Sequence, residues 1–445
     1  MHGWTSQPCH AYRPRFSEEE ELSAVPSVVR MFRVETVCSP EELRGDAHAW
    51  NALLAETPGA TFFRTLDWLE AYWRRAGDDE RIFVQKIYEG RSPIGFLPLT
   101  IRRESSRAGT LRTLTYPLHD WGTFYGPIGP RPGVCLRYGL AAAREMAWSD
   151  SRMTFDLVEL RWIDHERGDD DRVAQAMELA GLPSVAATWN EAFLLRSPGP
   201  VGESSAGEAW HASLPRKFRA HLRRMEKRAD EAGGFRRVTW RPRGSAYGDD
   251  DPRLDLYDDC LAVAERSWQA DPERGVTLCT PATAPFLRDV HIAAARAGAV
   301  QIDLVYLRDQ PIAFAYGYTW NGSYFGLRNG FDPDFSEYAP GAVATVQALE
   351  RALDAGDVTI DLGPGSGGYK RTLGGLPCPI GCRTHFPPYS LKAQLLRAKR
   401  WLRPSALGRY DDARPKDDEV VQPAENDAAP SAAADAVESP KLVDA

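Results

Sequence analysis

The sequence predicts an α/β protein in which a mixed sheet with flanking helices occurs in two tandem copies. Two observations lead to this prediction: a hairpin motif occurs twice, and the same order of elements follows each occurrence. The composition permits it, because 43% hydrophobic residues in a chain of 445 residues can form two sizeable cores.

The repeated hairpin begins at a tyrosine and continues through a polar turn to Pro-Ile, a small residue and Phe. It reads YEGRSPIGF from Tyr88 and YLRDQPIAF from Tyr306. Alternating apolar runs stand on both sides of each copy, as expected for two antiparallel strands joined by a tight turn.

Each copy then continues with a helical stretch and a buried strand. CLRYGLAAAREMAW leads to MTFDLVEL in the first copy, and GAVATVQALERALDAG leads to VTIDLG in the second. Asp156 and Asp361 fall at matching places in the two strands. The order strand, hairpin, strand, helix, strand therefore occurs twice, over about residues 31–197 and 205–390.

The segments outside the copies are assigned by composition. Residues 1–30 and 411–445 lack a continuous apolar core, and the second segment holds ten acidic and three basic residues. Both are predicted to be disordered, because they cannot bury enough surface to offset chain entropy. The rest of the chain is close to neutral.

A basic helix is predicted at 391–410. Its Leu391, Leu395 and Leu402 are expected to face a core or a partner, and packing on its own domain is the simpler arrangement. Its cationic side chains could instead make peripheral contact with anionic lipid through residues 391–403.

A second basic helix is predicted between the copies, in LPRKFRAHLRRMEKRADEAGG. Phe218, Leu222, Met225 and Ala229 form one apolar stripe, and arginine and lysine cover most of the remaining surface. Arg219 and its neighbours could bind an anionic substrate or a phosphate, whereas a solvated helix face is the simpler interpretation. Nucleic acid is not the expected partner, because no aromatic residues are interleaved with these charges.

Residues 359–373, TIDLGPGSGGYKRTL, contain G-x-G-x-x-G after a strand, but their context excludes the usual nucleotide-binding loops. Glycine and proline interrupt the helix that a dinucleotide fold requires, and a P-loop requires Lys directly after Gly, followed by Ser or Thr. We interpret the stretch as an open loop in which Gly365 and Gly367 border the substrate and present Tyr369 and Lys370. An ordinary surface turn with an exposed lysine is the alternative.

EYAPGAVATVQALERAL is a second candidate phosphate site. Pro340 suits the first turn of a helix, and Gly341 leaves the start of that helix bare. Free N–H groups there attract a pyrophosphate, although many ordinary helices begin in the same way.

Taken together, these segments resemble a known family. FRAHLRRMEKRADEAGG, ERSWQ, QPIAFAYGYTWNGSYFGLRNGFDPDFSEYAPG and DLGPGSGGYKRTLG, in this order, resemble the second half of the CelD-like acetyltransferases. Those are tandem members of the GNAT superfamily and are related in fold to the Fem-type aminoacyl transferases. The first copy is similar more loosely, and its PIGPRPGVCLRYG offers no clear phosphate-binding turn.

The resemblance implies transfer of an acyl group, acetyl in the family's usual chemistry, from acyl-CoA to an amine or hydroxyl. It also implies a small-molecule or glycan-precursor acceptor, such as a cell-envelope or exopolysaccharide precursor. The expected localisation is cytoplasmic, at the inner face of the membrane if the protein contacts lipid. In that superfamily the cofactor lies between two central strands. Its pyrophosphate would meet Pro340, Gly341 and Ala342, where Glu337-x-x-Pro-Gly replaces the usual Arg/Gln-x-x-Gly-x-Gly/Ala, and Arg328 is expected to contact the cofactor.

The same resemblance assigns chemical roles. Lys370 could stabilise the oxyanion and Tyr369 could protonate the thiolate. The base stays open between Glu265, in ERSWQ, and Asp120, in LHDWG, either of which could simply pair with arginine. Trp268 is expected in the pocket wall or the core.

Two other functions stay compatible with the sequence. A Fem-like enzyme would take its acyl group from aminoacyl-tRNA, bound through residues 216–228, and a non-catalytic paralogue would keep the fold as a binding or scaffold protein. No metal is expected, because Cys378, Cys382 and His385 lack a fourth ligand in sequence. The seven scattered cysteines indicate free thiols.

Overall fold

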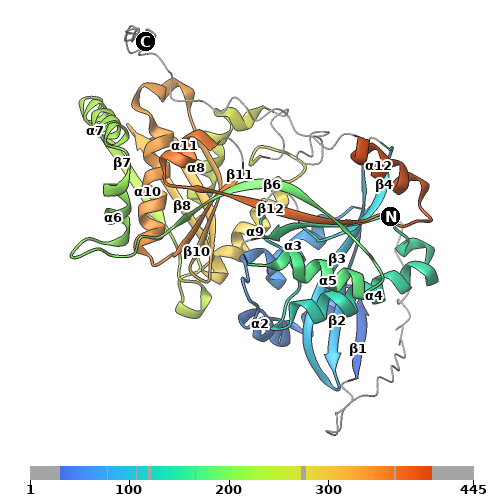
Figure 1. Cartoon of the computed structure of the whole chain (residues 1–445). Helices are drawn as coiled ribbons and strands as arrows, with labels where there is room; N and C mark the ends of the chain where they lie inside the picture. The colour runs from blue at the N-terminus through green and yellow to red at the C-terminus, as the bar shows by residue number, and fades with distance from the viewer. Residues whose placement is uncertain are drawn as a thin grey trace, which may run out of the picture.

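The computed structural model describes residues 31–402 apart from 78, 107, 119–121, 166, 272–276 and 365–366. The segments predicted to be disordered, 1–30 and 411–445, lie outside the described residues. Figure 1 shows two α/β halves joined by two long strands that cross the middle of the molecule.

One sheet of twelve strands runs through both halves, in the order β1-β2-β3-β4-β5-β12-β6-β11-β10-β9-β8-β7. The strands are β1 (Phe32–Val37), β2 (Arg81–Glu89), β3 (Ser92–Glu104), β4 (Leu111–Thr115), β5 (Leu157–Asp164), β6 (Val185–Arg196), β7 (Phe235–Trp240), β8 (Val300–Leu307), β9 (Gln310–Trp320), β10 (Ser323–Phe331), β11 (Thr359–Pro364) and β12 (Leu376–His385).

Helices flank the sheet. The α-helices are α1 (Pro40–Arg44), α2 (Ala47–Ala55), α3 (Leu66–Arg75), α4 (Pro132–Ser149), α5 (Asp169–Leu179), α6 (Ala206–Ser213), α7 (Arg216–Glu231), α8 (Leu254–Ala264), α9 (Ala284–Ala297), α10 (Pro340–Asp354), α11 (Gly367–Thr372) and α12 (Leu391–Leu402). Short 3₁₀ turns include η1 (Phe62–Arg64), η2 (Ser151–Met153), η3 (Ser245–Tyr247), η4 (Trp268–Ala270) and η6 (Pro333–Tyr338).

The two halves of the sheet repeat one pairing scheme, which confirms the tandem fold. β1 to β4 are antiparallel neighbours and β4 pairs with β5 in parallel, and β7 to β11 follow the same scheme. The predicted hairpins are β2–β3 and β8–β9. Both contain a register shift at the repeated tyrosine, Tyr88 in one and Tyr306 in the other. A bulge is a specific feature of a strand pair, so its recurrence supports common descent of the copies.

β6 and β12 join the halves by an exchange of strands. β6 follows the first half in sequence but pairs with β11, whereas β12 follows the second half but pairs with β5. The two strands also pair with each other, antiparallel, and Figure 1 shows them side by side across the middle. Each half thus completes its sheet with a strand that is joined to the other half. The domain limits near residues 197 and 205 stay a prediction.

Aromatic side chains lock the halves together where η1 meets β9. The ring centroid of Phe62 lies 4.9 Å from that of Tyr318, and the ring of Phe63 lies 5.8 Å from it. Trp68, on α3, packs edge to face on Phe286 of α9 at 5.3 Å. All five side chains are buried. This contact holds the first-half loop that precedes α3 against the second-half sheet.

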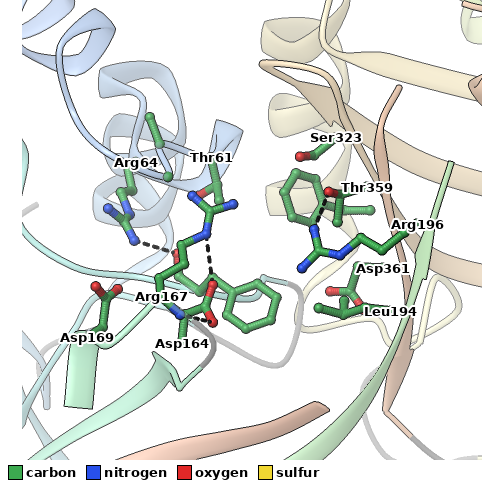
Figure 2. Close-up of a pocket in the computed structure, with 14 residues that line it drawn as sticks. Thr61, Arg64, Asp164, Arg167, Asp169, Leu194, Arg196, Ser323, Thr359 and Asp361 are labelled. Carbon is green, nitrogen blue, oxygen red and sulfur yellow. Dashed lines mark hydrogen bonds and ion pairs between the residues drawn. The ribbon is translucent and has the colours of Figure 1, made fainter. Parts of the chain in front are cut away.

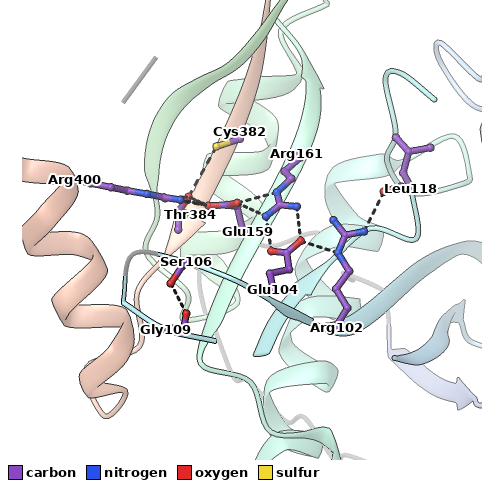
Figure 3. Close-up of polar contacts among 10 residues, drawn as sticks. All are labelled: Arg102, Glu104, Ser106, Gly109, Leu118, Glu159, Arg161, Cys382, Thr384 and Arg400. Carbon is purple, nitrogen blue, oxygen red and sulfur yellow. Dashed lines mark hydrogen bonds and ion pairs between the residues drawn. The ribbon is translucent and has the colours of Figure 1, made fainter. Parts of the chain in front are cut away.

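A buried ionic network ties β3, β5 and the last helix together (Figure 3). Glu104 accepts two hydrogen bonds from Arg161, at 2.7 and 2.6 Å, and one from Arg102 at 2.7 Å. Glu159, which is fully buried, accepts from Arg161 at 2.8 Å and from Arg400 at 3.0 Å. Burial alone would raise the pKa of the Glu104 carboxyl, but the two arginines outweigh it and lower the pKa to about 2.

The last helix, α12, does not turn the predicted side chains inward. Leu391, Leu395 and Leu402 are 85%, 49% and 69% exposed, so the expectation that they face the core is wrong. Ala393 and Leu396 are buried in their place. The reason is Arg400, which must point inward to pair with the Glu159 carboxylate, because a buried charge without a partner is costly.

We expect Glu104→Gln to lower the free energy of unfolding at pH 7 by about 3 kcal/mol, because it leaves two buried arginines without their carboxylate. The wild-type advantage should disappear as the pH falls from about 4.5 towards about 2, since the folded-state pKa of this carboxyl lies below its ordinary value and protonation removes the ion pairs. Denaturant titrations at several pH values measure both effects.

The matched control is Glu70→Gln, because Glu70 pairs at 3.0 Å with Arg44, whose side chain is 53% exposed. An ion pair with such an exposed partner contributes little to stability, because water and salt screen it. Equal losses in the two variants, or a Glu104→Gln loss that does not depend on pH, would contradict a stabilising network.

Candidate active site

The parallel pair β10–β11 opens after three residue pairs. Pairing runs from Ser323 opposite Thr359 to Phe325 opposite Asp361 and then stops, although both strands continue. A register shift between Gly326 and Arg328 bends β10 at this point, and beyond it β10 keeps its pairing with β9. The edge of β10 beyond the shift therefore faces a gap between the strands, and of its backbone groups the carbonyls of Leu327 and Asn329 already accept side-chain hydrogen bonds.

Tyr369, on α11, stands across this gap from β10. Its hydroxyl lies 3.4 Å from Nδ2 of Asn329, and the side chain is 37% exposed. Partial burial raises the pKa of Tyr369 above its ordinary value, against a smaller opposite effect of Asn329. The phenol therefore keeps its proton at neutral pH and can donate it.

Lys370 points inward rather than to solvent, so the alternative of an exposed lysine on a surface turn is wrong. Its side chain is buried, and Nζ donates to the carbonyls of Gly363 at 2.9 Å and Pro364 at 2.7 Å. The ammonium also lies 5.7 Å from the centre of the Phe193 ring on β6. Lys370 thus ties α11 to the end of β11. Its role towards an oxyanion stays a prediction.

The glycines of the loop divide between described and undescribed residues. Gly367 opens α11, and a Cβ there would lie 2.7 Å from the Phe193 ring. Close packing of α11 on β6 therefore explains this glycine, whether or not substrate lies beside it. Gly365 lies outside the described residues.

The start of α10 lies at the end of β10. Pro340 is the first helical residue, and a Cβ on Gly341 would lie 2.9 Å from the ring of Phe331, the last residue of β10. The N–H groups of Ala342 and Val343 both bond the carbonyl of Ala339. Pro340 has no N–H, so this helix start offers a ligand fewer donors than most. The N–H of Gly341 makes no backbone hydrogen bond within the described part of the chain.

Of the other predicted residues, Arg328 and Trp268 lie at or beside β10, whereas Glu265 and Asp120 are not placed at the gap. Arg328 sits at the bend of β10, where its Nη1 donates to the carbonyl of Leu327 at 2.8 Å. Trp268 is half-buried at the start of η4, and the next residue, Gln269, donates to the carbonyl of Asn329 at 2.9 Å. Glu265 is exposed at the end of α8. Asp120 lies outside the described residues.

The basic helix α7 borders the start of α10. Leu222, Met225 and Ala229 are buried as predicted. Arg228 forms an ion pair at 2.6 Å with Glu337 in η6, the turn that leads into α10. Arg219 donates from Nε to the carbonyl of Leu214 at 3.1 Å. The helix thus brings positive charge near the predicted pyrophosphate position.

A small cavity, partly open to solvent, lies between the halves next to the point where β10 and β11 part. Figure 2 shows Arg64 and Thr61 on the first-half side and Ser323, Thr359 and Asp361 on the second-half side. Arg167 pairs with Asp164 at 3.0 Å, and Arg196 donates to the Thr359 hydroxyl at 2.6 Å. The lining holds three arginines and also three aspartates, Asp164, Asp169 and Asp361, so the guanidinium groups can bind one anionic group of a ligand while the cavity as a whole is charge-balanced.

Two buried charged side chains in this cavity have unsatisfied atoms. Arg64 is 5% exposed and donates from Nη2 to the carbonyl of Phe124 at 3.0 Å, but its Nε has no hydrogen-bond partner among the described residues. Asp361 is 3% exposed and accepts from the Gly363 N–H at 2.7 Å, and the nearby Thr123 hydroxyl interacts with the same carboxylate, although Asp361 Oδ2 makes no close hydrogen bond within the described residues. A buried polar atom left unpaired costs about 1–3 kcal/mol, so such atoms indicate a ligand or water position.

Burial has opposite effects on these two groups. It raises the pKa of Asp361 above its ordinary value, and it lowers the pKa of Arg64. A carboxylate with a raised pKa beside the strand gap is suited to accept a proton. The sequence indicated Asp361 only as a marker of the repeat, and it predicted no role for Arg64 or Arg196. The available signal was a charged residue in the middle of a buried strand, in TIDLG.

Comparison with known proteins identifies the second half. Residues 216–371 match the family model described as an acetyltransferase (GNAT) domain. This part of the chain is a GNAT domain. The gap between β10 and β11 and the start of α10 therefore belong to an acyltransferase domain.

Solved structures extend the likeness over most of the chain. FemX is similar with a TM-score of 0.51 at 10% identity, over 79% of this chain and 98% of that one, which shows the fold alone. A tandem GNAT protein from the clavulanic acid biosynthesis pathway has a TM-score of 0.43 at 13% identity, over 80% of this chain and 99% of its own. L-PGS from Bacillus licheniformis has a TM-score of 0.45 at 12% identity, over 80% and 96%. None of the curated proteins matches the sequence.

Two further findings concern other kinds of site. Within the described ranges, no group of three or more His, Cys, Asp or Glu side chains is arranged to hold a metal ion. His385, one of the three residues with zinc-like spacing, engages the carbonyl of Pro183 through Nδ1 at 2.8 Å. None of the described helices is long and apolar enough to cross a membrane.

We expect Ala339→Gly to raise the free energy of unfolding by about 1 kcal/mol, because Ala339 holds a left-handed conformation with φ 45° and ψ 46°. Ala342→Gly, three residues further into α10, is the control and should lower stability by up to about 1 kcal/mol. Denaturant unfolding of both variants gives the comparison. A stability loss in Ala339→Gly would contradict strain at this helix start.

Proposed function

We propose that this chain transfers an acyl group from acyl-CoA to an amine or hydroxyl of an anionic acceptor. The observation that carries the proposal is the opening of β10–β11 beyond Phe325 and Asp361, with Tyr369 facing Asn329 across it. In members of the GNAT superfamily, the gap between the corresponding strands holds the thioester arm of acyl-CoA.

The residues around the gap fit that ligand. The free edge of β10 after its bend supplies backbone groups for the amide-rich arm of acyl-CoA. The Gly341 N–H and the cationic face of α7 supply partners for its phosphates. Because this helix start, with Pro340 and two engaged N–H groups, offers few donors, we propose that α7 contributes more of the phosphate binding than is usual for the family.

Residues beside the gap can perform the proton transfers and the carbonyl polarisation that acyl transfer requires. Asp361 takes a proton from the acceptor amine or hydroxyl, whose nitrogen or oxygen then attacks the acyl carbon. N–H groups at the bend of β10 polarise the carbonyl. As the carbon–sulfur bond breaks, Tyr369 donates its proton to the leaving sulfur. A deprotonated base and a protonated acid at the same pH require separated pKa values, and burial keeps the phenol well above the carboxyl.

The cavity between the halves is the acceptor site of this proposal. It lies beside Asp361 and contains Arg64, Arg167 and Arg196. A sugar precursor that bears phosphate or carboxylate, as in cell-envelope or exopolysaccharide synthesis, matches these guanidinium groups by charge and hydrogen bonding. Acetyl-CoA is the first donor to test, because acetyl is the usual acyl group of the family.

Isothermal titration of the full chain with acetyl-CoA and longer acyl-CoAs tests the donor directly, and we expect saturable binding. Tyr369→Phe should bind acyl-CoA with unchanged affinity while kcat falls about 10²-fold, because the change removes only the proton that the leaving thiolate needs. Thioester consumption measured by thiol release gives the rate. Lys370→Ala is less informative, because it also leaves the carbonyls of Gly363 and Pro364 without the ammonium that donates to them.

Tyr247→Phe is the control, since Tyr247 is 65% exposed on η3. A chain that binds no acyl-CoA but retards charged tRNA in a salt-dependent gel shift would be a Fem-like transferase instead. A chain that binds neither donor would be a binding or scaffold protein. Either result overturns the proposal.

Asp361→Asn should lower kcat by about 10²- to 10⁴-fold with little change in acyl-CoA affinity, because it removes the proposed base. The wild-type rate should rise with pH through a pKa above the ordinary value for aspartate, since only the ionised carboxylate accepts a proton and burial raises that pKa. The variant should lose this rise. A profile of kcat against pH measures both.

Asp156→Asn, the counterpart of Asp361 in the first copy, is the matched control. Asp156 accepts from the N–H of Arg112 at 3.0 Å and lies outside the cavity. The role of Asp361 would be refuted if the two variants had equal rates, or if Asp361→Asn kept the wild-type pH profile.

A further inference from the structure

We infer that the outer face of α12 binds the surface of an anionic phospholipid membrane. The inference goes beyond the proposed function and does not depend on it. It rests on the direction in which this helix turns its leucines, on what fixes that direction, and on the charges beside them.

An apolar stripe runs along the outside of α12. It consists of Leu391, Leu395, Ala398 and Leu402, at spacings of four, three and four residues, and all four are exposed. We call it the outer stripe. Trp401, next to its end, is 77% exposed. Water-facing leucines at helical spacing expose apolar surface that a monomeric protein ordinarily buries.

The outward direction of the stripe is fixed from the inside. Ala393 and Leu396 pack on the sheet, in a small cluster with Leu111, Leu157 and Phe386. Arg400 completes this inner face and bonds the fully buried Glu159 at 3.0 Å (Figure 3). Rotation of α12 to bury the outer stripe would withdraw Arg400 and leave a buried carboxylate short of a partner. The helix therefore presents its leucines to the outside as part of its folded state.

The charges of α12 have one sign. The helix carries Lys392, Arg397, Lys399 and Arg400 and contains no acidic residue. Arg400 points inward, and Lys392 donates to the carbonyl of Thr110 at 3.0 Å. Arg397 and Lys399 are exposed on either side of Ala398 in the outer stripe. An apolar stripe bordered by cations is the pattern of a helix that lies in the plane of an anionic membrane.

Exposed aromatic side chains continue this surface before α12 begins. Trp148, at the end of α4, is 74% exposed, and Tyr389 is 56% exposed. Their ring centroids lie 5.5 Å apart. Tryptophan and tyrosine favour the headgroup level of a membrane, because each has an apolar ring and a polar atom.

The length of the helix agrees with lying on a membrane and not with crossing one. Twelve residues of α-helix span about 18 Å, whereas a transmembrane helix requires about 20 apolar residues. The acidic segment 411–445 of the same chain matches the cations of α12 in charge, but it contains no aromatic residue to cover the leucines. A membrane satisfies both features of the surface.

Co-sedimentation of the full chain with lipid vesicles tests the inference without any substrate. We expect binding to vesicles that contain phosphatidylglycerol, much weaker binding to phosphatidylcholine alone, and loss of binding as salt rises. The double variant Leu395→Glu/Leu402→Glu should reduce the partition coefficient by at least about tenfold, because it removes two buried side chains and adds negative charge. Arg397→Gln and Lys399→Gln should each reduce it about fivefold.

Leu376→Glu is the control variant, because Leu376 is 67% exposed on β12, away from α12. It should bind vesicles as the wild type does. All the changed side chains are exposed, so equal thermal unfolding curves establish that the variants fold. Absence of vesicle binding by the full chain, or equal binding by the stripe variant and the wild type, would overturn the inference. A lower molecular mass in solution for the stripe variant than for the wild type would also overturn the inference, because it would identify the stripe as a contact between two copies of the chain.

Discussion

The pairing of β6 with β12 is the interaction on which the rest of the structure depends. Because each strand is joined to one half and completes the sheet of the other, the two copies cannot be placed independently. β6 brings Arg196 to the cavity and Phe193 beneath Lys370 and Gly367. β12 leads into the last helix and holds it beside Glu159. A cavity between two lobes would ordinarily vary in width as the lobes move, but here continuous strands cross its floor, so the groups on its two sides keep their spacing.

Buried carboxylates in this molecule occur in two opposite electrostatic situations. Glu104 is surrounded by guanidinium groups, which hold its pKa at about 2, and its oxygens accept bonds from two arginines. Asp361 is more deeply buried, at 3% exposed, and its burial outweighs the nearby Lys370 ammonium, so its pKa rises. The difference is that Lys370 spends two of its hydrogen bonds on the carbonyls at the end of β11. The first arrangement stabilises the fold, whereas the second keeps a reactive group poised beside an open gap, at a cost in stability that functional sites commonly carry.

The sequence was most informative where local patterns decide the structure. Alternation and turn residues predicted both hairpins, helical periodicity predicted α7 and α10, and repetition predicted the tandem sheet. It was least informative where the structure depends on contacts between residues that are far apart in the sequence. The inward turn of Arg400 depends on Glu159, which is far away in sequence, so periodicity alone could not decide whether the leucines of α12 face the core or a partner. Strand exchange leaves no local pattern, because β6 and β12 read as ordinary strands whichever sheet they join. Asp361 was visible as a charge within an apolar strand, but its neighbours in the cavity come from both copies.

The two copies differ in the segment that follows their fourth strand. In the second copy the chain leaves β10, turns through η6 and enters α10, and the gap towards β11 stays open. In the first copy the chain after β4 returns to β3, where Ile128 bridges to Phe96, and it buries Tyr116 and Tyr125 with ring centroids 5.2 Å apart. Gly129 has no room for a side chain, since a Cβ would lie within 2.4 Å of the carbonyl oxygen of Ile94. This returning segment also carries Phe124, whose carbonyl anchors Arg64. The first copy thus uses this segment to present an arginine to the cavity, while the second copy supplies the strand gap on the opposite side.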